Sequence, residues 1–303
     1  MTRETIPGTV LRLQSGFYSV ETAQGMVTCI LRGRLKVRSF PGDVIAVGDH
    51  VQISPQTDGT GAIEVIEPRH SELVRLDPTP RGNYRQILLA NIDQMVMVFA
   101  CANPEPHLRM LDRFLVICEK QGIPALIVAN KVDLVDRSVA EARFRMYPPL
   151  GYDVIFTSTL TGEGVAELHD RLKGRITGLA GPSGVGKSSL LNAIQPYLGL
   201  AVREVSQFSE KGRHTTNVRE LFPLVDGGGY VADLPGLRSL ALWDTEPEEL
   251  DGYFPELRDL VMDCQFNDCT HRDEPGCAVR QAVEAGSVNP ERYISYLKLR
   301  FGE

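Results

Sequence analysis

The chain has 303 residues, a formal net charge of −7 at pH 7 and a hydrophobic content of 43%. This length suggests two or three domains, and the composition is ordinary for a globular protein that buries a large core without a disulfide framework. The acidic balance excludes nucleic-acid binding through overall charge, so any such role must depend on a local basic surface.

The sequence predicts neither a membrane protein nor a secreted one. Its longest apolar run, 95–102, is far shorter than the roughly 18–20 residues that span a bilayer. Residues 1–8 contain no apolar signal region. We therefore expect a cytoplasmic protein with no membrane partner, in which reduced thiols favour zinc over disulfides.

The first 70 or so residues have the pattern of an all-β domain. Short β-rich runs, separated by glycine, proline and aspartate, lie at 10–13, 17–20, 26–31 and 50–53. Such runs are typical of a small barrel, and the OB-fold is the natural candidate. We expect an N-terminal β-barrel domain over residues 1–72.

A basic stretch follows the third of these runs. Arg32, Arg34, Lys36 and Arg38 alternate with other residues, so they would share one face if the stretch were an extended strand. Such a stripe could contact the phosphates of a nucleic acid. The alternative is a solvated strand face without a partner.

Strands and helices alternate after residue 86. Apolar runs of strand length occupy 94–100 and 124–129, and helical spacing occupies 108–121 and 164–173. This alternation predicts a parallel sheet with helices on both faces. We expect this central α/β domain to cover residues 73–240.

A phosphate-binding loop is the clearest motif in the chain. The loop fits G-x-x-x-x-G-K-[ST] and consists of Gly181, Pro182, Ser183, Gly184, Val185, Gly186, Lys187 and Ser188. An apolar run at 176–180 precedes the loop, and a helical pattern at 188–197 follows it. Its glycines let backbone N–H groups approach phosphate oxygens at the positive end of the next helix. Lys187 would reach the β- and γ-phosphates, and Ser188 would bind Mg²⁺.

A second motif selects the base. The residues Asn130, Lys131, Val132 and Asp133 follow a buried strand, where α/β sheets place ligand contacts. The Asp133 carboxylate can accept hydrogen bonds from the N1–H and the 2-amino group of guanine, a donor pair that adenine lacks. The next strand ends with Phe156, Thr157, Ser158 and Thr159, which would offer backbone contacts to the guanine oxygen.

A third motif reports the γ-phosphate. Asp233 and Gly236 form D-x-x-G after a short apolar run, so Asp233 would hold Mg²⁺ through water and the Gly236 amide would contact the γ-phosphate. Between this motif and the phosphate loop, Thr215 or Thr216 could complete the Mg²⁺ shell. We favour Thr216, with Thr215 left open.

The order of these motifs is rotated. Ordinary GTPases place the base-reading motif last, whereas here it comes first, so we expect a circularly permuted GTPase domain. Leu237 stands where a glutamine often positions water, which leaves His214 as the internal candidate for catalysis. We expect slow intrinsic turnover, on the order of 10⁻⁴ to 10⁻² s⁻¹, that a partner accelerates.

The C-terminal part, residues 241–303, has a helical pattern and a cluster of metal-binding residues. Cys264, Cys269, His271 and Cys277 supply three thiolates and one imidazole within 14 residues. Four such ligands suit tetrahedral Zn²⁺ with no open position, which indicates one structural zinc. The alternative is a set of unrelated buried cysteines.

These motifs together resemble the RsgA family of ribosome small-subunit-dependent GTPases. The resemblance covers nearly the whole chain, including 90–94, the run 181–189 with Ser189, 212–216 and 292–296. It implies an OB-fold, a permuted GTPase domain and a zinc domain. It also implies binding to the small ribosomal subunit and its rRNA, GTP hydrolysis stimulated by that subunit, and a role in its late maturation, with His214 as the switch histidine.

Two other functions stay open at this point. One is a nucleotide-gated RNA-binding module in which hydrolysis is incidental, since Leu237 cannot orient water. The other is a signalling GTPase with a protein partner, although no C-terminal lipidation motif is present. We expect the chain to act as a monomer that binds GTP or GDP with Mg²⁺.

Overall fold

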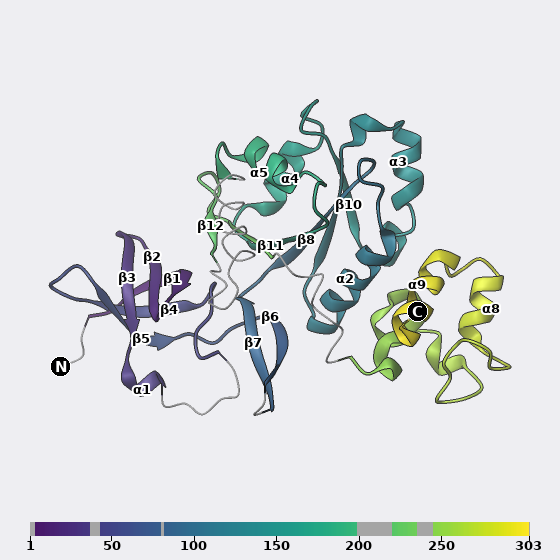
Figure 1. The fold of residues 1–303 in the computed structure, drawn as a ribbon, viewed down its shortest axis with the longest axis horizontal. Helices are drawn as coiled ribbons and strands as arrows, with labels where there is room; N and C mark the ends of the chain where they lie inside the picture. Colours follow the sequence, from purple (N-terminus) through teal and green to yellow (C-terminus); the bar gives the residue numbers. More distant parts are fainter. Residues whose placement is uncertain (1–3, 37–42, 80–81, 199–219, 235–244, 303) are drawn as a thin grey trace. The chain divides into compact units, whose positions relative to one another are not determined.

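The computed structural model describes residues 4–36, 43–79, 82–198, 220–234 and 245–302 (Figure 1). Its internal contacts group the chain into two compact units. Unit one comprises Met1–Val96, Gly164–Ala180 and Lys187–Pro235. Unit two comprises Met97–Glu163, Gly181–Gly186 and Gly236–Glu303. The predicted domain limits at 72 and 240 are therefore not tested by this division, and residue 240 lies outside the described residues.

Unit one begins with a closed five-stranded barrel, which confirms the predicted N-terminal β-barrel. Its strands pair in the order β1-β2-β3-β5-β4, and β4 pairs back to β1 (Figure 1). The strands are β1 (Ile6–Gln14), β2 (Phe17–Thr22), β3 (Gly25–Leu31), β4 (His50–Pro55) and β5 (Gly61–Ile66). Alternate residues such as Val10, Val20 and Ile53 point inward and form the barrel core, as expected for strands with period-two patterning.

The predicted basic strand face is wrong. Residues Gly33–Lys36 form a short helix, α1, so this stretch is not an extended strand. Arg32 forms an ion pair with Glu64, with 3.0 Å between Nε and Oε1. Arg38 lies outside the described residues.

A two-stranded antiparallel sheet follows the barrel, and sequence patterning did not predict it. It consists of β6 (Glu72–Thr79) and β7 (Gly82–Ala90). Arg69 joins it to the barrel end because its guanidinium contacts Asp49 at 2.6 Å and Glu72 at 2.9 Å. The Asp49 carboxylate is fully buried, so this is a buried ion pair rather than a surface one. It fixes the segment that leads from the barrel into β6.

The rest of unit one contains part of a six-stranded α/β sheet. The strands in this part lie in the order β8-β11-β13-β12, and β8 (Gln94–Ala100) begins in unit one and ends in unit two. The other strands are β11 (Ile176–Ala180), β13 (Tyr230–Asp233) and β12 (Phe222–Pro223). Strands β11 and β13 run parallel, as the alternating pattern predicted. The helices that accompany these strands in unit one are α4 (Val165–Leu172) and α5 (Lys187–Ile194).

Unit two holds the order β10-β9-β8, with β9 (Ala125–Asn130) and β10 (Asp153–Thr157) in parallel. Helix α2 (Leu108–Gln121) ends at Gly122, whose φ of 64° provides a left-handed C-cap. Two 3₁₀ turns, η1 (Val132–Leu134) and η2 (Pro148–Leu150), flank helix α3 (Arg137–Phe144).

Short helices form the C-terminal part of unit two. They are η4 (Pro247–Tyr253), α7 (Pro255–Arg258), η5 (Val261–Asp263), α8 (Ala278–Glu284) and α9 (Pro290–Phe301). Their shared core includes Phe254, Leu257 and Tyr296, together with Val116 of α2. The C-terminal helices therefore pack on α2 of the same unit. Within the described residues no helix combines the length and apolarity needed to cross a membrane.

Candidate nucleotide site and metal centre

The base-reading motif and the phosphate loop meet at Asn130. This residue ends β9 and is 1% exposed. Its Nδ2 donates to the Val185 carbonyl at 2.8 Å, and its Oδ1 accepts from the Thr157 hydroxyl at 2.9 Å. Asn130 thus joins the ends of β9 and β10 to the phosphate loop across a wide sequence separation.

Lys131 makes a second contact between the base motif and the phosphate loop. It has a φ of 61°, a left-handed conformation that turns its side chain back over the phosphate loop. Its Nζ donates to the Gly184 carbonyl at 2.7 Å and to the Asn103 carbonyl. The aliphatic part of this side chain forms a wall beside the loop, as expected for a long snorkelling residue.

The Asp133 carboxylate is exposed and oriented. Asp133 lies in η1 beside the buried Val132, and Ser158 donates its hydroxyl hydrogen to Asp133 Oδ1 at 2.5 Å. Ser158 is buried, whereas Thr159 is exposed. A fixed carboxylate with its remaining lone pairs open can accept a donor pair such as that of guanine.

The phosphate loop has the backbone that its glycines predict. Gly181, Gly184 and Gly186 have φ values of 147°, 79° and 97°, which other residues rarely adopt. A Cβ on Gly186 would lie 2.5 Å from Asn130 Nδ2, so the close approach of loop and base motif requires glycine. Within the loop Pro182 and Val185 are buried, and Ser183 is exposed.

Replacing Gly181 by alanine should destabilise unit two by roughly 2–6 kcal/mol, from backbone strain and a steric clash together. The new Cβ would lie 2.1 Å from the Val98 carbonyl oxygen, at a φ of 147°. Gly151→Ala is the matched control, because its φ is 91° but nothing lies within 4 Å. Denaturant unfolding measures both, and equal destabilisation would contradict the predicted clash.

The remaining predicted phosphate-site residues that the structure describes belong to unit one. Lys187, Ser188 and Ser189 begin α5. Asp233 ends β13 opposite Leu179 of β11, the strand that leads into the phosphate loop. Asp233 therefore lies at the carboxyl edge of the parallel strands, where ligands bind in such sheets. The predicted residues His214, Thr216 and Gly236 lie outside the described residues.

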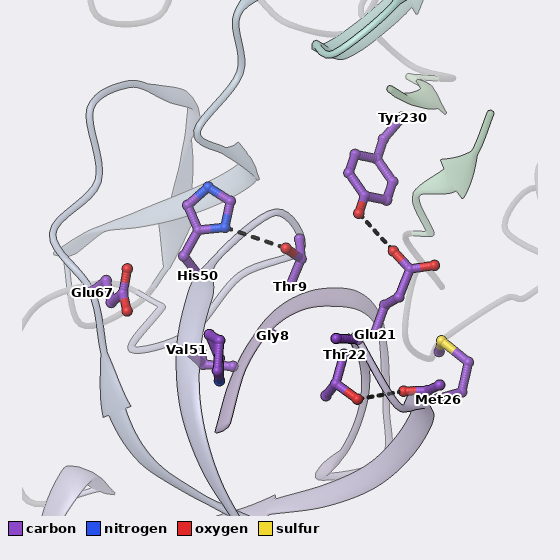
Figure 2. A pocket seen from close by; sticks show the side chains of 12 residues that line it. Gly8, Thr9, Glu21, Thr22, Met26, His50, Val51, Glu67 and Tyr230 are labelled. Carbon is purple, nitrogen blue, oxygen red and sulfur yellow. Dashed lines mark hydrogen bonds between the residues drawn. The ribbon is translucent and has the colours of Figure 1, made fainter. Parts of the chain in front are cut away.

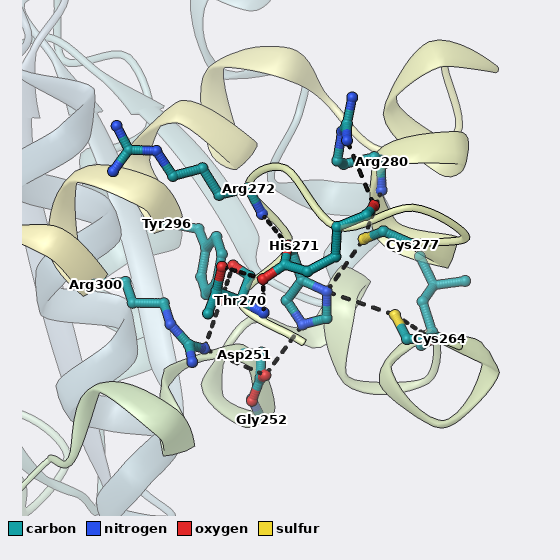
Figure 3. Close-up of polar contacts among 12 residues, drawn as sticks. Asp251, Gly252, Cys264, Thr270, His271, Arg272, Cys277, Arg280, Tyr296 and Arg300 are labelled. Atoms are coloured by element: carbon teal, nitrogen blue, oxygen red, sulfur yellow. Dashed lines mark hydrogen bonds and ion pairs between the residues drawn. The ribbon is translucent and has the colours of Figure 1, made fainter. Parts of the chain in front are cut away.

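The four predicted metal ligands converge in unit two. Figure 3 shows Cys264, His271 and Cys277 of this set. The ligand atoms of Cys264, Cys269, His271 and Cys277 all lie within 4.8 Å of one another. His271 Nδ1 lies 3.5 Å from the Cys264 sulfur and 3.4 Å from the Cys277 sulfur. This Cys₃His set fits a tetrahedral structural zinc, since all four positions come from the chain.

The surroundings of the cluster support the same fit. Burial raises the pKa of the Cys269 thiol to about 12, so a cation bound there would have to displace the proton of this thiol. Glu274 accepts from the Thr270 amide at 2.8 Å and from the Arg272 amide at 3.0 Å, which closes the loop on both sides of His271. The Tyr293 hydroxyl donates to the His271 carbonyl at 2.6 Å.

Two residues with a direct part in these sites were not predicted. Asn103 accepts from Lys131 of the base motif, and Asp251 contacts the imidazole of His271. Thr157, whose hydroxyl donates to Asn130, belongs to the predicted strand end 156–159. Asp251 and Asn103 carry no motif, because each reaches its partner only through the tertiary fold.

A hollow of about 490 Å³ lies in unit one, between the barrel and β13 (Figure 2). The Tyr230 hydroxyl donates to Glu21 Oε2 at 2.6 Å across it, and Thr9 Oγ1 lies 3.3 Å from His50 Nδ1. Glu21 and Glu67 both line this hollow, so its charge disfavours a phosphate. The Tyr230 contact instead joins the barrel to the sheet strand that carries Asp233.

The fold and the motif order define a class. An α/β domain that places the base-reading strand end before its phosphate loop is a circularly permuted P-loop GTPase. The model of the RsgA GTPase family matches residues 66–243, and that of the RsgA N-terminal domain matches residues 7–63. The chain belongs to the RsgA GTPase family, whose members are GTP hydrolases.

Curated relatives and solved structures agree with this assignment. The small ribosomal subunit biogenesis GTPase RsgA of Gemmatimonas aurantiaca is 49% identical over 296 residues, covering 97% of this chain and 96% of that protein. The protein of the same name from Moorella thermoacetica is 45% identical over 290 residues, covering 96% and 94%.

Among solved structures, YjeQ from Thermotoga maritima has a TM-score of 0.80 at 37% identity, covering 99% of this chain and 98% of that one. YloQ, a circularly permuted GTPase, has a TM-score of 0.74 at 31% identity, covering 99% and 95%. The predicted family, fold class and enzyme class are thereby confirmed.

Proposed function

We propose that this GTPase binds the small ribosomal subunit and its rRNA, assists late maturation of the subunit, and hydrolyses GTP to GDP faster when the subunit is bound. GTP binding is supported by the hydrogen bond from Asn130 Nδ2 to the Val185 carbonyl, at 2.8 Å, which joins the base motif to the phosphate loop. The family and the names of its relatives support the ribosomal part.

The nucleotide contacts are proposed as follows. Asp133 accepts from the guanine edge, with Lys131 along the base and Ser158 and Thr159 at the guanine oxygen. Backbone amides of 181–189 surround the phosphates, and Lys187 neutralises the charge that develops on them. Ser188, Asp233 and Thr216 would hold Mg²⁺, which would neutralise phosphate charge when bound.

Hydrolysis needs a group that orients water, and His214 is the proposed one. Leu237 offers no polar atom at the position after the D-x-x-G motif. A histidine can accept or relay a proton near neutral pH. We also propose that the chain works as a monomer in the cytoplasm, where reduced thiols leave Cys264, Cys269, His271 and Cys277 available for one structural zinc.

Asp133→Asn should weaken GDP binding by roughly 100-fold or more, because two charge-assisted hydrogen bonds to guanine are lost or reversed. The same change should strengthen XDP binding, since the new amide can donate to the additional oxygen of xanthine. Calorimetric titration with GDP and XDP measures both. Asp136→Asn, an exposed carboxylate three positions on, is the control. Unchanged GDP affinity in Asp133→Asn would refute the assigned base contact.

Cosedimentation with purified ribosomal subunits tests the partner. We expect the chain to sediment with small subunits in the presence of a non-hydrolysable GTP analogue and to be released with GDP. Large subunits serve as the control and should not retain it. Failure to bind small subunits in either nucleotide state would contradict the proposal and favour a signalling GTPase with another partner.

A further inference from the structure

The imidazole of His271 uses its two nitrogens on opposite sides. Nδ1 faces the thiols of Cys264 and Cys277, whereas Nε2 lies 3.2 Å from Asp251 Oδ2 (Figure 3). The His271 side chain is fully buried, so neither nitrogen can be satisfied by bulk water. If Nδ1 binds a metal as a neutral imidazole, the ring proton must reside on Nε2 and needs an acceptor.

Asp251 is built to be that acceptor. Its side chain is 13% exposed, and its other oxygen, Oδ1, accepts from the Gly252 amide at 2.8 Å. Arg300 Nη1 lies 3.7 Å from Oδ2 on another side. The carboxylate is thus held in one orientation by groups from η4 and α9, with Oδ2 directed at the imidazole.

The backbone of His271 is fixed as well. His271 has a φ of 60°, a left-handed conformation that is uncommon for this residue type. Its carbonyl accepts from Tyr293, and its ring lies 5.8 Å from the Tyr296 ring. The ring is therefore surrounded by the thiols of Cys264 and Cys277, the Asp251 carboxylate and the Tyr296 ring. Among the described residues, only Asp251 lies within hydrogen-bond distance of Nε2.

We propose that Asp251 is a positioning residue of the zinc site, which holds the Nε2–H tautomer of His271 and aims Nδ1 at the metal. This inference rests on the proposed structural zinc. Carboxylate partners of metal-bound histidines raise ligand basicity and fix ring orientation, and their loss typically weakens metal binding about 10–100-fold. Asp251 also joins the zinc loop to η4, which packs in the same core as α9.

A direct metal-ligand role for Asp251 fits less well. Four ligand atoms already lie within 4.8 Å of one another, and Asp251 is not among them. Its contact is to the ring nitrogen that faces away from the thiols. A purely structural role through Arg300 is distinguishable, because it would lower stability and leave the zinc affinity of the folded protein unchanged.

The test is zinc affinity of the full chain, measured by competition with a chromogenic chelator. Asp251→Ala should bind zinc about 10–100-fold more weakly than wild type. Asp251→Asn should lose less, since an amide oxygen still accepts from Nε2–H without a charge. Glu248→Gln, an exposed carboxylate on the same 3₁₀ helix, should match wild type. Cobalt substitution adds a readout, because its absorption bands report thiolate and imidazole ligation.

The outcomes distinguish failure of the proposed zinc site from failure of the proposed role of Asp251. Wild-type zinc binding together with wild-type affinity in Asp251→Ala would overturn the role of Asp251 and leave the zinc site intact. An absence of zinc in the wild-type protein would overturn both. If Asp251→Ala does not fold, Asp251→Asn must still bind zinc more weakly than Glu248→Gln, and equal affinities would overturn the inference.

Discussion

Replacing Cys277 by serine is expected to abolish stoichiometric zinc binding and to unfold the helices around the metal centre. A structural zinc contributes about 10–16 kcal/mol of apparent binding free energy to folding in small domains. Cys277 is 2% exposed and also caps α8 by accepting from the Arg280 amide at 3.5 Å. Metal analysis and amide hydrogen exchange of α8 and α9 measure the two effects.

Cys29→Ser is the control for the loss of a buried thiol. Cys29 is fully buried in the barrel core and does not belong to the cluster of predicted metal ligands. It should keep one zinc per chain and normal exchange in α8 and α9. A Cys277→Ser protein that retains its zinc and its helix protection would show that the Cys₃His set is a fortuitous cluster.

Arg292→Met is expected to destabilise unit two by about 3–5 kcal/mol, because it leaves two buried carboxylates without the cation that balances their charge. The Arg292 guanidinium donates to Asp112 Oδ1 at 2.7 Å and to both Glu256 oxygens, at 2.6 and 3.1 Å. Its side chain is 1% exposed. Burial lowers the pKa of Arg292, but the two carboxylates outweigh this effect and raise it, so the guanidinium stays charged.

This cluster connects the GTPase part of unit two to the zinc part. Asp112 belongs to α2 and also accepts from the Tyr147 hydroxyl at 2.9 Å, whereas Arg292 belongs to α9. Hydrogen exchange of α2 and α9 amides would report the loss. Lys298→Met, on the same helix but partly exposed, should cost less than about 1 kcal/mol.

A triple variant separates charge from packing in this cluster. Arg292→Met combined with Asp112→Leu and Glu256→Met removes every charge of the triad, so no buried carboxylate is left unpaired. It should be more stable than Arg292→Met alone, because apolar replacement of buried ion networks is often close to neutral. If the single variant is no less stable than Lys298→Met, the cluster does not hold the two parts together.

Elements with a strong local signal could be predicted from the sequence. The predicted strands 94–100 and 176–180 and the helix 108–121 coincide with β8, β11 and α2. Each is an apolar run or stripe bounded by glycine, proline or a polar turn, so burial and local preference agree. The meeting of Asn130 with the phosphate loop was also predictable, because parallel strands end at one edge of a sheet.

Features that depend on distant partners could not be predicted. Charged residues interrupt the alternation of β6 and β7, so the hairpin was missed even though Leu73 and Leu89 are buried. The alternating charges at 32–38 suggested a strand, but a helix of four residues forms there instead. Arg292 looks like a solvated helix residue until Asp112 and Glu256 are brought to it by the fold.

We expect the small ribosomal subunit to accelerate GTP hydrolysis by this chain. Single-turnover GTP hydrolysis with and without purified small subunits measures this effect, with large subunits as the control. Alone, the protein should hydrolyse GTP on the order of 10⁻⁴ to 10⁻² s⁻¹, as unassisted GTPases do. Small subunits should raise this rate at least about ten-fold, in line with the much larger gains that GTPase partners can provide. A rate that small subunits leave unchanged would contradict the account.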